Sequence, residues 1–207
     1  MLLALVFLAA YLLGSLSGSL LLGKLRGVDI RTQGSGNAGG TNAFRTQGIK
    51  FALGVVLIDV GKGVLAAWLA QHFLPDHNSA AFLAVAAAII GHIWPVFHGF
   101  RGGKGAATLV GGLGVIWPYG LWLFLTVWIL CLLLTGYVGL STILAAISLL
   151  VSAYFFNSDL LHALFASTMA ILIAFSHRNN VRRLLAGTES RFEKARLLGR
   201  LLFANRE

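Results

Sequence analysis

The stretch LVGGLGVIWPYGLWLFLTVWILCLLLT, residues 109–135, decides how many helices this chain places in a membrane. It runs for 27 residues without an Asp, Glu, Lys or Arg, and Pro118 interrupts it near the middle. About 20 apolar residues are enough for one helix to cross the hydrocarbon core of a bilayer. The stretch is therefore either one long tilted helix or two helices that meet at the proline, because proline disrupts helical hydrogen bonding.

The composition of the whole chain is that of a membrane protein. Of 207 residues, 57% are hydrophobic and 11% are charged, which is too little charge to cover a water-facing surface. Soluble domains carry roughly 25% charged residues. The single cysteine, Cys131, excludes an intrachain disulfide. The net charge of +9 would suit nucleic acid only on a soluble surface, so no nucleic-acid partner is expected. We predict an all-α polytopic membrane protein with one domain over residues 1–207.

Other segments also have the length of a membrane span: Met1–Leu22, Phe51–Leu74, Ser79–His98, Tyr137–Asn157 and Leu160–Ser176. The intervening chain is basic in three places, residues 23–50, 99–108 and 177–207, which hold all but one of the 16 Lys and Arg residues. Basic segments stay in the cytoplasm during membrane insertion. All three segments are therefore expected on the cytoplasmic face, with the N-terminus outside.

This orientation fixes the number of crossings. Residues 99–108 and the tail 177–207 lie on one face only if an even number of helices separates them. If residues 109–135 cross twice, that number is four, so we predict seven transmembrane helices and a cytoplasmic C-terminus. The cost is a fourth helix of about 12 residues, or about 18 Å, too short to span roughly 30 Å of hydrocarbon alone. A single tilted helix and six spans are the alternative.

The first basic segment contains Gly-Ser-Gly-Asn-Ala-Gly-Gly-Thr-Asn at residues 34–42. Glycines allow positive φ and close approach of the backbone, whose free N–H groups bind anions. Polar side chains are interspersed: Ser35, Asn37, Thr41, Asn42 and then Arg45. The segment is interpreted as a cradle for a phosphate or carbonyl. A flexible turn between two spans is an equally weighted alternative.

Two more segments carry candidate chemistry. Gly102 and Gly103 precede Lys104 at the start of a predicted helix, and a lysine held there suits a phosphate. His177 and Asn180 open the third basic segment. His177 is a candidate general base, although a lone histidine at a membrane interface is more often a helix cap or a hydrogen-bond donor.

Two pairs of polar residues lie within the predicted spans. Asp59 and Lys62 are three residues apart, and because an isolated charge in a membrane is costly, they are expected to pair with each other or with polar loop groups. Ser141 and Thr142 begin a span on the cytoplasmic side. They either reach a substrate or bond back to their own helix.

The absence of several motifs narrows the reaction class. The sequence has no Asp-rich cluster, no His-x4-Asp pair and no Gly-x-Ser-x-Gly elbow. An enzyme without these groups is expected to use an activated donor with a good leaving group. Positioning and charge neutralisation then suffice for the reaction.

Four segments occur in order along nearly the whole chain and together resemble the PlsY family, the bacterial acyl-phosphate:glycerol-3-phosphate acyltransferases. They are residues 34–42, DVGKG at 59–63, GHIWPVFHGFRGGKGAAT at 91–108 and HRNNVRRLLAGTE at 177–189. The resemblance implies seven helices in the bacterial inner membrane, a cytoplasmic active site and a monomer. It implies acyl transfer from acyl-phosphate to the 1-hydroxyl of glycerol 3-phosphate, giving lysophosphatidic acid and phosphate, without metal or organic cofactor.

The resemblance also implies roles for individual residues. Those expected to act in catalysis are Ser35, Arg45, Lys104 and His177. Those expected to bind substrate are Gly36, Asn37, Gly39, Thr41, Asn42, Gly102, Gly103, Ser141, Thr142 and Asn180. Thr142 stands where members often have serine, which keeps the hydroxyl. The proton of the acceptor hydroxyl goes either to His177 or to a phosphate oxygen of the substrate, and we favour the phosphate oxygen.

Two rival functions remain open at this stage. One is a small transporter or flippase for a phosphorylated lipid, which commonly shows internal repeats; no convincing repeat is found. The other is an acyltransferase with a thioester donor. The tail after Gly187 is basic with interleaved apolar residues and forms either an interfacial helix or a disordered segment.

Overall fold

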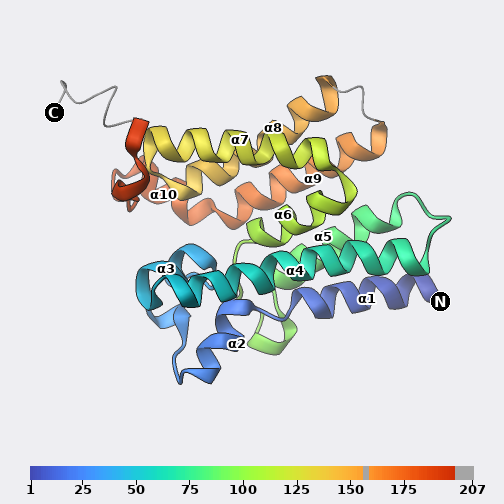
Figure 1. Ribbon diagram of the computed structural model, residues 1–207, viewed down its shortest axis with the longest axis horizontal. Coiled ribbons are helices and arrows are strands. Elements are labelled where there is room, and N and C mark those ends of the chain that lie inside the picture. Colours follow the sequence, from blue (N-terminus) through green and yellow to red (C-terminus); the bar gives the residue numbers. More distant parts are fainter. Residues whose placement is uncertain (156–158, 199–207) are drawn as a thin grey trace. The chain divides into compact units, whose positions relative to one another are not determined.

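The structure is a computed structural model that describes residues 1–155 and 159–198, and all regular elements in these ranges are helical (Figure 1). Within these ranges four helices are long and apolar enough to cross a membrane, or six if each of two bent helix pairs counts as one span. The predicted all-α membrane fold is confirmed at this level. Seven crossings and the orientation of the termini stay predictions.

The chain divides into two compact units, Met1–Pro118 and Tyr119–Glu207. The helices of the first unit are α1 (Leu2–Gly14), α2 (Gly18–Leu25), η1 (Ile30–Thr32), α3 (Gly40–Gln47), α4 (Ile49–Phe73), α5 (Ala80–Ile93), η2 (Val96–His98) and α6 (Ala106–Ile116). Those of the second are α7 (Pro118–Thr135), α8 (Val138–Phe155), α9 (Leu160–Ser176), α10 (Arg178–Leu185) and η3 (Glu193–Ala195). The predicted single domain stays a prediction.

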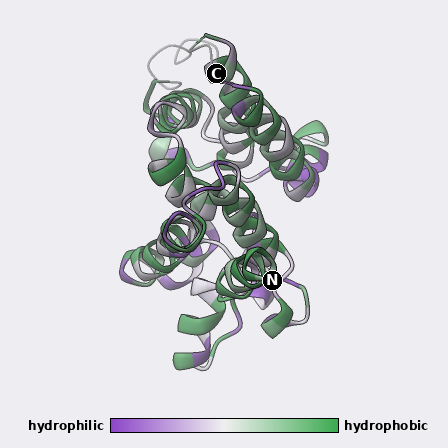
Figure 2. Cartoon of the chain, turned by 90° about the vertical axis from the view of Figure 1, so that its right-hand side faces the viewer, coloured by the Kyte–Doolittle hydropathy of each residue, from purple (hydrophilic) through white to green (hydrophobic). Residues whose placement is uncertain are grey.

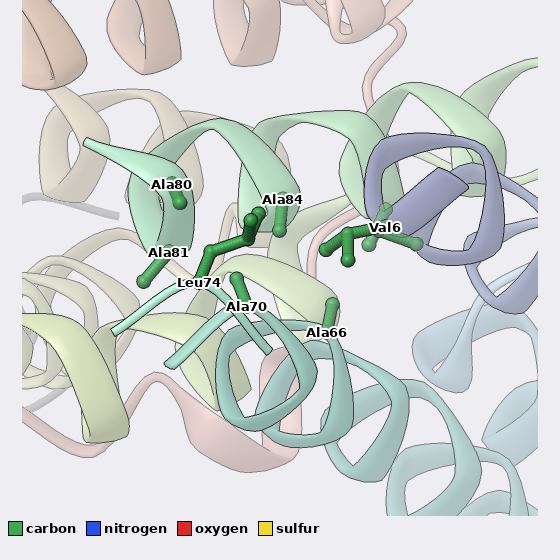
Figure 3. Packing of buried hydrophobic residues seen from close by; sticks show 9 residues of the cluster. Val6, Ala66, Ala70, Leu74, Ala80, Ala81 and Ala84 are labelled. Atoms are coloured by element: carbon green, nitrogen blue, oxygen red, sulfur yellow. The ribbon is translucent and has the colours of Figure 1, made fainter. Parts of the chain in front are cut away.

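The core of the first unit is built from small side chains. Helices α1, α4 and α5 pack together, and α6 packs against α4 and α5. Figure 3 shows the cluster between the first three of these helices, which is mostly alanine: Val6, Ala66, Ala70, Leu74, Ala80, Ala81 and Ala84. Small residues let membrane helices approach closely, and van der Waals contact then holds them together.

Glycines bring two helix pairs into backbone contact. A Cβ atom on Gly14 of α1 would overlap the carbonyl of Ala88 in α5, and one on Gly63 of α4 would overlap the carbonyl of Thr108 in α6. On the facing helix, Gly111 of α6 is equally close to Val60 of α4. Any side chain at these glycines would push the helices apart.

The distribution of polarity is that of a protein dissolved in lipid. Large apolar side chains are exposed on the long helices, for example Leu57 at 75% and Ile171 at 72%, whereas Asp59 and Lys62 are buried. Figure 2 shows the same helices coloured predominantly as hydrophobic. Lipid solvates exposed apolar groups, and costly charges face the interior of a bundle.

The first predicted span, Met1–Leu22, is not one continuous helix. Helix α1 ends at Gly14, Ser17 is extended, and α2 begins at Gly18 with its axis bent by 50°. The sequence contains no proline here, so the break was not predicted. Its cause is a pair of charges on α4, described below.

The decisive stretch at residues 109–135 does break near Pro118, as predicted. Helix α6 ends at Ile116, Trp117 leaves the helical region with φ −155° and ψ 73°, and α7 begins at Pro118. One uninterrupted helix is excluded. Helix α6 begins three residues earlier than predicted, because Gly105 caps it in a left-handed conformation. At 11 residues it is about 17 Å long.

In the second unit, α8 packs against α9, and α10 contacts both. The predicted spans Tyr137–Asn157 and Leu160–Ser176 appear as α8 and α9, and residue 157 lies outside the described ranges. From Thr188 to Arg196 the tail is irregular apart from η3, so an interfacial helix does not begin directly after Gly187. The apolar residues Leu202 and Phe203 lie outside the described residues.

Candidate active site

The glycine-rich segment 34–42 forms an ordered loop that one side chain holds in place. Asn42, at the start of α3 and 1% exposed, accepts a hydrogen bond from the Ser35 backbone N–H at 2.9 Å through Oδ1. Its Nδ2 donates to the carbonyls of Ile30 and Gln33 at 3.1 and 3.0 Å. Asn42 therefore holds this segment through three hydrogen bonds.

The exposed edge of this loop carries the predicted donors. Gly34 and Gly36 have φ of +56° and +71°, which turns the backbone around Ser35. Ser35 and Gly36 are exposed, whereas Asn37 folds back so that its Nδ2 lies close to Gly39, the N-cap of α3. Thr41 and Arg45 follow on one face of α3, four residues apart. A hydroxyl, backbone N–H groups and a guanidinium thus lie along one short segment.

The second glycine-rich loop lies against the end of α5. Gly102 and Gly103 donate their N–H groups to the carbonyls of Ile93 and His92 at 3.2 and 3.1 Å. A Cβ atom on Gly102 would overlap the His92 carbonyl. Lys104 comes next, half-buried, two residues before α6 begins. This position at a helix N-terminus favours an anion.

The structure brings the two loops together. A Cβ atom on Gly103 would lie 2.7 Å from the Ala38 carbonyl of the first loop, so only a glycine fits between the loops. The two segments predicted to bind phosphate, separated by some 60 residues in sequence, are neighbours within the first unit. A lysine that served only as a positively charged anchor at the membrane surface would not require glycines at this contact.

Arg31, which the sequence analysis counted only as a basic residue, ties the loops a second time. Its side chain forms a two-pronged ion pair with Asp29, with Nη2 2.8 Å from Oδ2. Its Nη1 donates to the carbonyls of His98 and Arg101 at 3.0 and 3.2 Å. The hydrogen bonds from the Arg31 side chain and backbone lower the pKa of Asp29 below its usual value.

A buried charged cluster lies beneath the loops. Asp59, Lys62 and His92 are each at most 3% exposed. Lys62 Nζ is 3.1 Å from Asp59 Oδ1 and 2.6 Å from His92 Nδ1. Asp59 and Lys62 were expected to pair with each other or with loop groups, and they do both. The role of His92 was missed, since nothing in its neighbourhood marks it as a partner of α4.

The same cluster holds the break between α1 and α2. Lys62 donates to the carbonyls of Gly14 and Leu16 at 2.9 and 3.1 Å. The Gly18 N–H donates to Asp59 Oδ1 at 3.1 Å. A cation thus faces the C-terminal end of α1 and an anion faces the N-terminal end of α2, which is the favourable arrangement for both helix dipoles.

In the second unit, His177 sits at the junction of α9 and α10 and is 4% exposed. Its Nδ1 lies 2.8 Å from the carbonyl of Ile173, and the Asn180 N–H donates to the His177 carbonyl at 2.8 Å. A carbonyl only accepts, so a hydrogen is assigned to Nδ1, which also lies 3.2 Å from Ser176 Oγ. The contact with the Ile173 carbonyl is that of a hydrogen-bond donor, and the role of His177 as a general base stays a prediction.

Asn180 is held by a carboxylate that the sequence analysis did not single out. Its Nδ2 donates to Glu189 Oε1 at 2.6 Å, and Arg183 Nε donates to Glu189 Oε2 at 2.7 Å. Gly139 of α8 packs on Asn180, leaving no room for a side chain there. Glu189 was visible only as the last residue of the quoted motif.

The hydroxyls of Ser141 and Thr142 bond to their own helix, which was the structural alternative for both. Ser141 Oγ donates to the Tyr137 carbonyl and Thr142 Oγ1 to the Val138 carbonyl, each at 2.8 Å. Thr142 Oγ1 also accepts from Trp128 Nε1 at 3.1 Å. Their predicted contact with substrate stays a prediction.

The chain is similar in sequence to a known protein family. A family model described as glycerol-3-phosphate acyltransferase matches residues 4–187. Proteins named glycerol-3-phosphate acyltransferase are similar over nearly their whole length. That of Chlorobaculum parvum is 40% identical over 90% of this chain and 94% of its own. That of Brucella canis is 43% identical over 91% of each.

Two solved structures share the fold. A crystal structure of PlsY (YgiH), an integral membrane glycerol 3-phosphate acyltransferase in its glycerol 3-phosphate form, is 34% identical over 99% of both chains with a TM-score of 0.87. The lysophosphatidic acid form of the same protein is 34% identical over 95% of this chain and 98% of that one, with a TM-score of 0.86.

Proposed function

This chain belongs to the glycerol-3-phosphate acyltransferase family of integral membrane proteins, the family of PlsY, and we propose that its acyl donor is an acyl-phosphate. The reaction transfers a fatty acyl group to the 1-hydroxyl of glycerol 3-phosphate. Its products are lysophosphatidic acid and inorganic phosphate. The related structures in glycerol 3-phosphate and lysophosphatidic acid forms support the acceptor and the product.

The observation that carries this proposal is the contact between the two glycine loops. Gly103 fits against the Ala38 carbonyl, so the loop bearing Arg45 and the loop bearing Lys104 are neighbours. Each loop supplies glycine backbone and one cation. Acyl-phosphate and glycerol 3-phosphate each carry a phosphate, so the two loops match the two anionic groups of this reaction.

The proposed mechanism relies on positioning and charge rather than on a covalent enzyme intermediate. Ser35, Gly36, Thr41 and Arg45 hold the acyl-phosphate, and their donors stabilise the charge that develops on the leaving phosphate. Lys104 anchors the phosphate of the acceptor. The acceptor hydroxyl attacks the acyl carbonyl carbon, the bond from that carbon to the phosphate oxygen breaks, and the hydroxyl proton passes to a phosphate oxygen.

The proposed roles of the second unit follow from the resemblance. His177 orients glycerol 3-phosphate through Nε2, the ring nitrogen that does not contact the Ile173 carbonyl. Asn180 binds phosphate or the glycerol backbone, presented by its hydrogen bond to Glu189. Ser141 and Thr142 are proposed as flanking substrate contacts. The remaining proposed contacts are backbone groups of the loops and the side chain of Asn37: Asn37, Gly39, Gly102 and Gly103. For Asn42 the hydrogen bonds within the loop favour positioning over direct binding.

A specific observation argues against each of the two rival functions, a thioester-dependent acyltransferase and a transporter. A thioester donor carries no phosphate at its reacting carbonyl, so it would leave one of the two loops without a ligand. A broken helix is common at the substrate site of transporters. Here the break between α1 and α2 is occupied by the side chains of Asp59 and Lys62.

The test is an assay of purified protein with acyl-phosphate and glycerol 3-phosphate, followed by measurement of phosphate and lysophosphatidic acid. We expect equal molar release of both. Glycerol in place of glycerol 3-phosphate is the control for acceptor recognition, and acyl-CoA in place of acyl-phosphate tests the thioester rival. Product with acyl-CoA but not with acyl-phosphate would overturn the proposed donor.

We also propose that the protein is a monomer in the bacterial inner membrane with seven helices and a cytoplasmic site. The three basic segments support this orientation. Reporter fusions after residues 77 and 187 test it, because they are expected on opposite faces. Reporters on one face would contradict the seven-helix topology, and light scattering of the purified protein tests the monomer.

A further inference from the structure

The cluster of Asp59, Lys62 and His92 takes no part in the proposed reaction. Burying two charges within a membrane is costly unless they are paired and hydrogen-bonded. The contacts of Asp59 and Lys62 with the break between α1 and α2 explain two members of the cluster. They do not explain why a histidine is the third.

The contacts of His92 differ on the two sides of its ring. On one side, Nδ1 is 2.6 Å from Lys62 Nζ. The Asp59 Oδ1 atom lies farther from the same nitrogen, at 3.5 Å. Because the shorter contact is to Lys62, whose ammonium group only donates, Nδ1 is assigned as the acceptor and the ring hydrogen to Nε2. Because Lys62 is itself fixed by the Gly14 and Leu16 carbonyls, the orientation of the imidazole is determined by the bundle core.

On the other side, His92 supports the second glycine loop. A Cβ atom on Gly103 would overlap His92 Nε2, and one on Gly102 would overlap the His92 carbonyl, so both glycines lie directly on this residue. The Gly103 N–H also donates to the His92 carbonyl at 3.1 Å. Lys104 is the next residue, and its backbone position follows from that of Gly103.

We propose that His92 is a positioning residue: its imidazole, oriented by Lys62, sets the backbone of Gly103 and thereby places Lys104 against the phosphate of the acceptor. The inference rests on the proposed function of Lys104. It predicts a larger defect for glycerol 3-phosphate than for acyl-phosphate. Lys104 is bonded directly to Gly103, whereas Ala38, the donor-loop residue that Gly103 contacts, is three residues from Ser35 and seven from Arg45. A displacement of about 1 Å of a binding group is enough to reduce affinity and rate.

The experiment compares His92→Leu with His92→Asn in full-length protein in detergent. Leucine fills similar volume without an acceptor for Lys62, whereas Oδ1 of asparagine replaces the Nδ1 acceptor. The matched control is Val85→Ala, which removes a buried side chain two turns away on α5, where Val85 faces Gly112 of α6. The measurements are the KM for each substrate, the Kd of glycerol 3-phosphate without donor, and the Tm.

We expect His92→Leu to raise the KM and the Kd for glycerol 3-phosphate at least ~10-fold. The KM for acyl-phosphate is expected to rise less than ~3-fold. We expect His92→Asn to recover at least half of the acceptor affinity on a logarithmic scale. Val85→Ala is expected to lower Tm without separating the two KM values. If His92→Leu does not fold, the Asn variant is compared with His92→Gln, which offers Lys62 no acceptor at the Nδ1 position.

Two results would overturn the inference. One is an unchanged Kd of glycerol 3-phosphate in the His92 variants, and the other is an equal rise of both KM values together with a fall in Tm like that of Val85→Ala. Failure of the proposed function is distinct, because wild-type protein would then release no phosphate from acyl-phosphate and glycerol 3-phosphate before any variant is compared.

Discussion

The Lys62 ammonium donates to the Gly14 carbonyl at 2.9 Å and joins the middle of α4 to the last residue of α1. Removing this cation leaves Asp59 buried without its charge partner. We expect Lys62→Met to cost about 3–5 kcal/mol of unfolding free energy, since an uncompensated buried charge is expensive. Denaturation in detergent micelles, followed by tryptophan fluorescence, measures this loss.

The control for this prediction is the double variant Asp59→Asn with Lys62→Met. It removes both charges and is expected to be more stable than Lys62→Met alone. Equal stability of the single and the double variant would show that the charge pair is not what the fold depends on.

Two glycines of α4 offer a matched pair. A Cβ atom on Gly63 would overlap the Thr108 carbonyl of α6, whereas one on Gly61 would meet nothing within 4 Å. We expect Gly63→Ala to destabilise the protein by about 1–3 kcal/mol through overpacking. Gly61→Ala is expected to be neutral or to stabilise by about 0.5–1 kcal/mol, because alanine favours a helix. Thermal unfolding checks both, and equal shifts would contradict the close packing of α4 on α6.

Lys104→Ala is expected to abolish measurable turnover while the protein stays folded. Loss of one preorganised charged contact in a site costs about 100-fold or more in rate. The measurement is phosphate release at saturating acyl-phosphate, with circular dichroism as the check on folding. Lys50→Ala is the control, because Lys50 is an exposed cation at the start of α4, outside both loops. Near-normal activity of Lys104→Ala would remove the proposed acceptor site.

Substitutions of His177 distinguish the two proton acceptors. His177→Asn keeps a side-chain donor for the Ile173 carbonyl, which lies 2.8 Å from Nδ1. If a phosphate oxygen takes the proton, we expect His177→Asn to retain a rate within ~10-fold of wild type and His177→Ala to lose much more. Single-turnover rates at saturating substrates measure this. A substantial rate in His177→Asn excludes general-base catalysis by His177, whereas an Asn variant as inactive as Ala although both fold contradicts this prediction.

Stability should depend on pH through Asp29. Its folded pKa lies below the usual 3.8 because Arg31 donates hydrogen bonds to it. The group therefore contributes stability above pH 3.8 and loses it as the pH falls through the lower folded value. Since the side chain is 41% exposed, the contribution is about 0–1 kcal/mol.

The check is the difference in Tm between wild type and Asp29→Asn at several pH values. A small difference at pH 7 is expected to disappear in strong acid. Asp76→Asn, at an exposed position between α4 and α5, is the control for a general effect of removing one negative charge. A difference that grows on acidification would contradict the assigned direction of the shift.

The sequence was informative where the cause of a structural feature is local. Pro118 predicted the break between α6 and α7, and the glycines around Lys104 indicated a loop before α6. The sequence did not predict structural features whose cause lies far away along the chain. The break at residues 15–17 depends on Lys62, which is 46–48 residues away from the carbonyls it contacts. Arg31 and His92 carry no local mark of the loops that they hold.

The candidate site divides in the same way. Residues that bind a phosphate form a recognisable pattern in the sequence, because glycines, hydroxyl groups and a cation are needed close together. Residues that hold those groups in place do not. Asn42 was assigned to substrate, but it contacts the Ser35 N–H of its own loop and the carbonyls of Ile30 and Gln33 just before that loop. Glu189 behind Asn180 likewise became visible only through its hydrogen bonds.

The groups that contact Lys62 are made in a definite order during synthesis of the chain. The Gly14 and Leu16 carbonyls are synthesised 48 and 46 residues before Lys62, and His92 follows 30 residues after it. Two acceptors of the lysine therefore precede α4 in the chain, and its aspartate lies one turn away in the same helix. For helices that insert in the order of their synthesis, both charges of α4 thus have a partner before α5 is made.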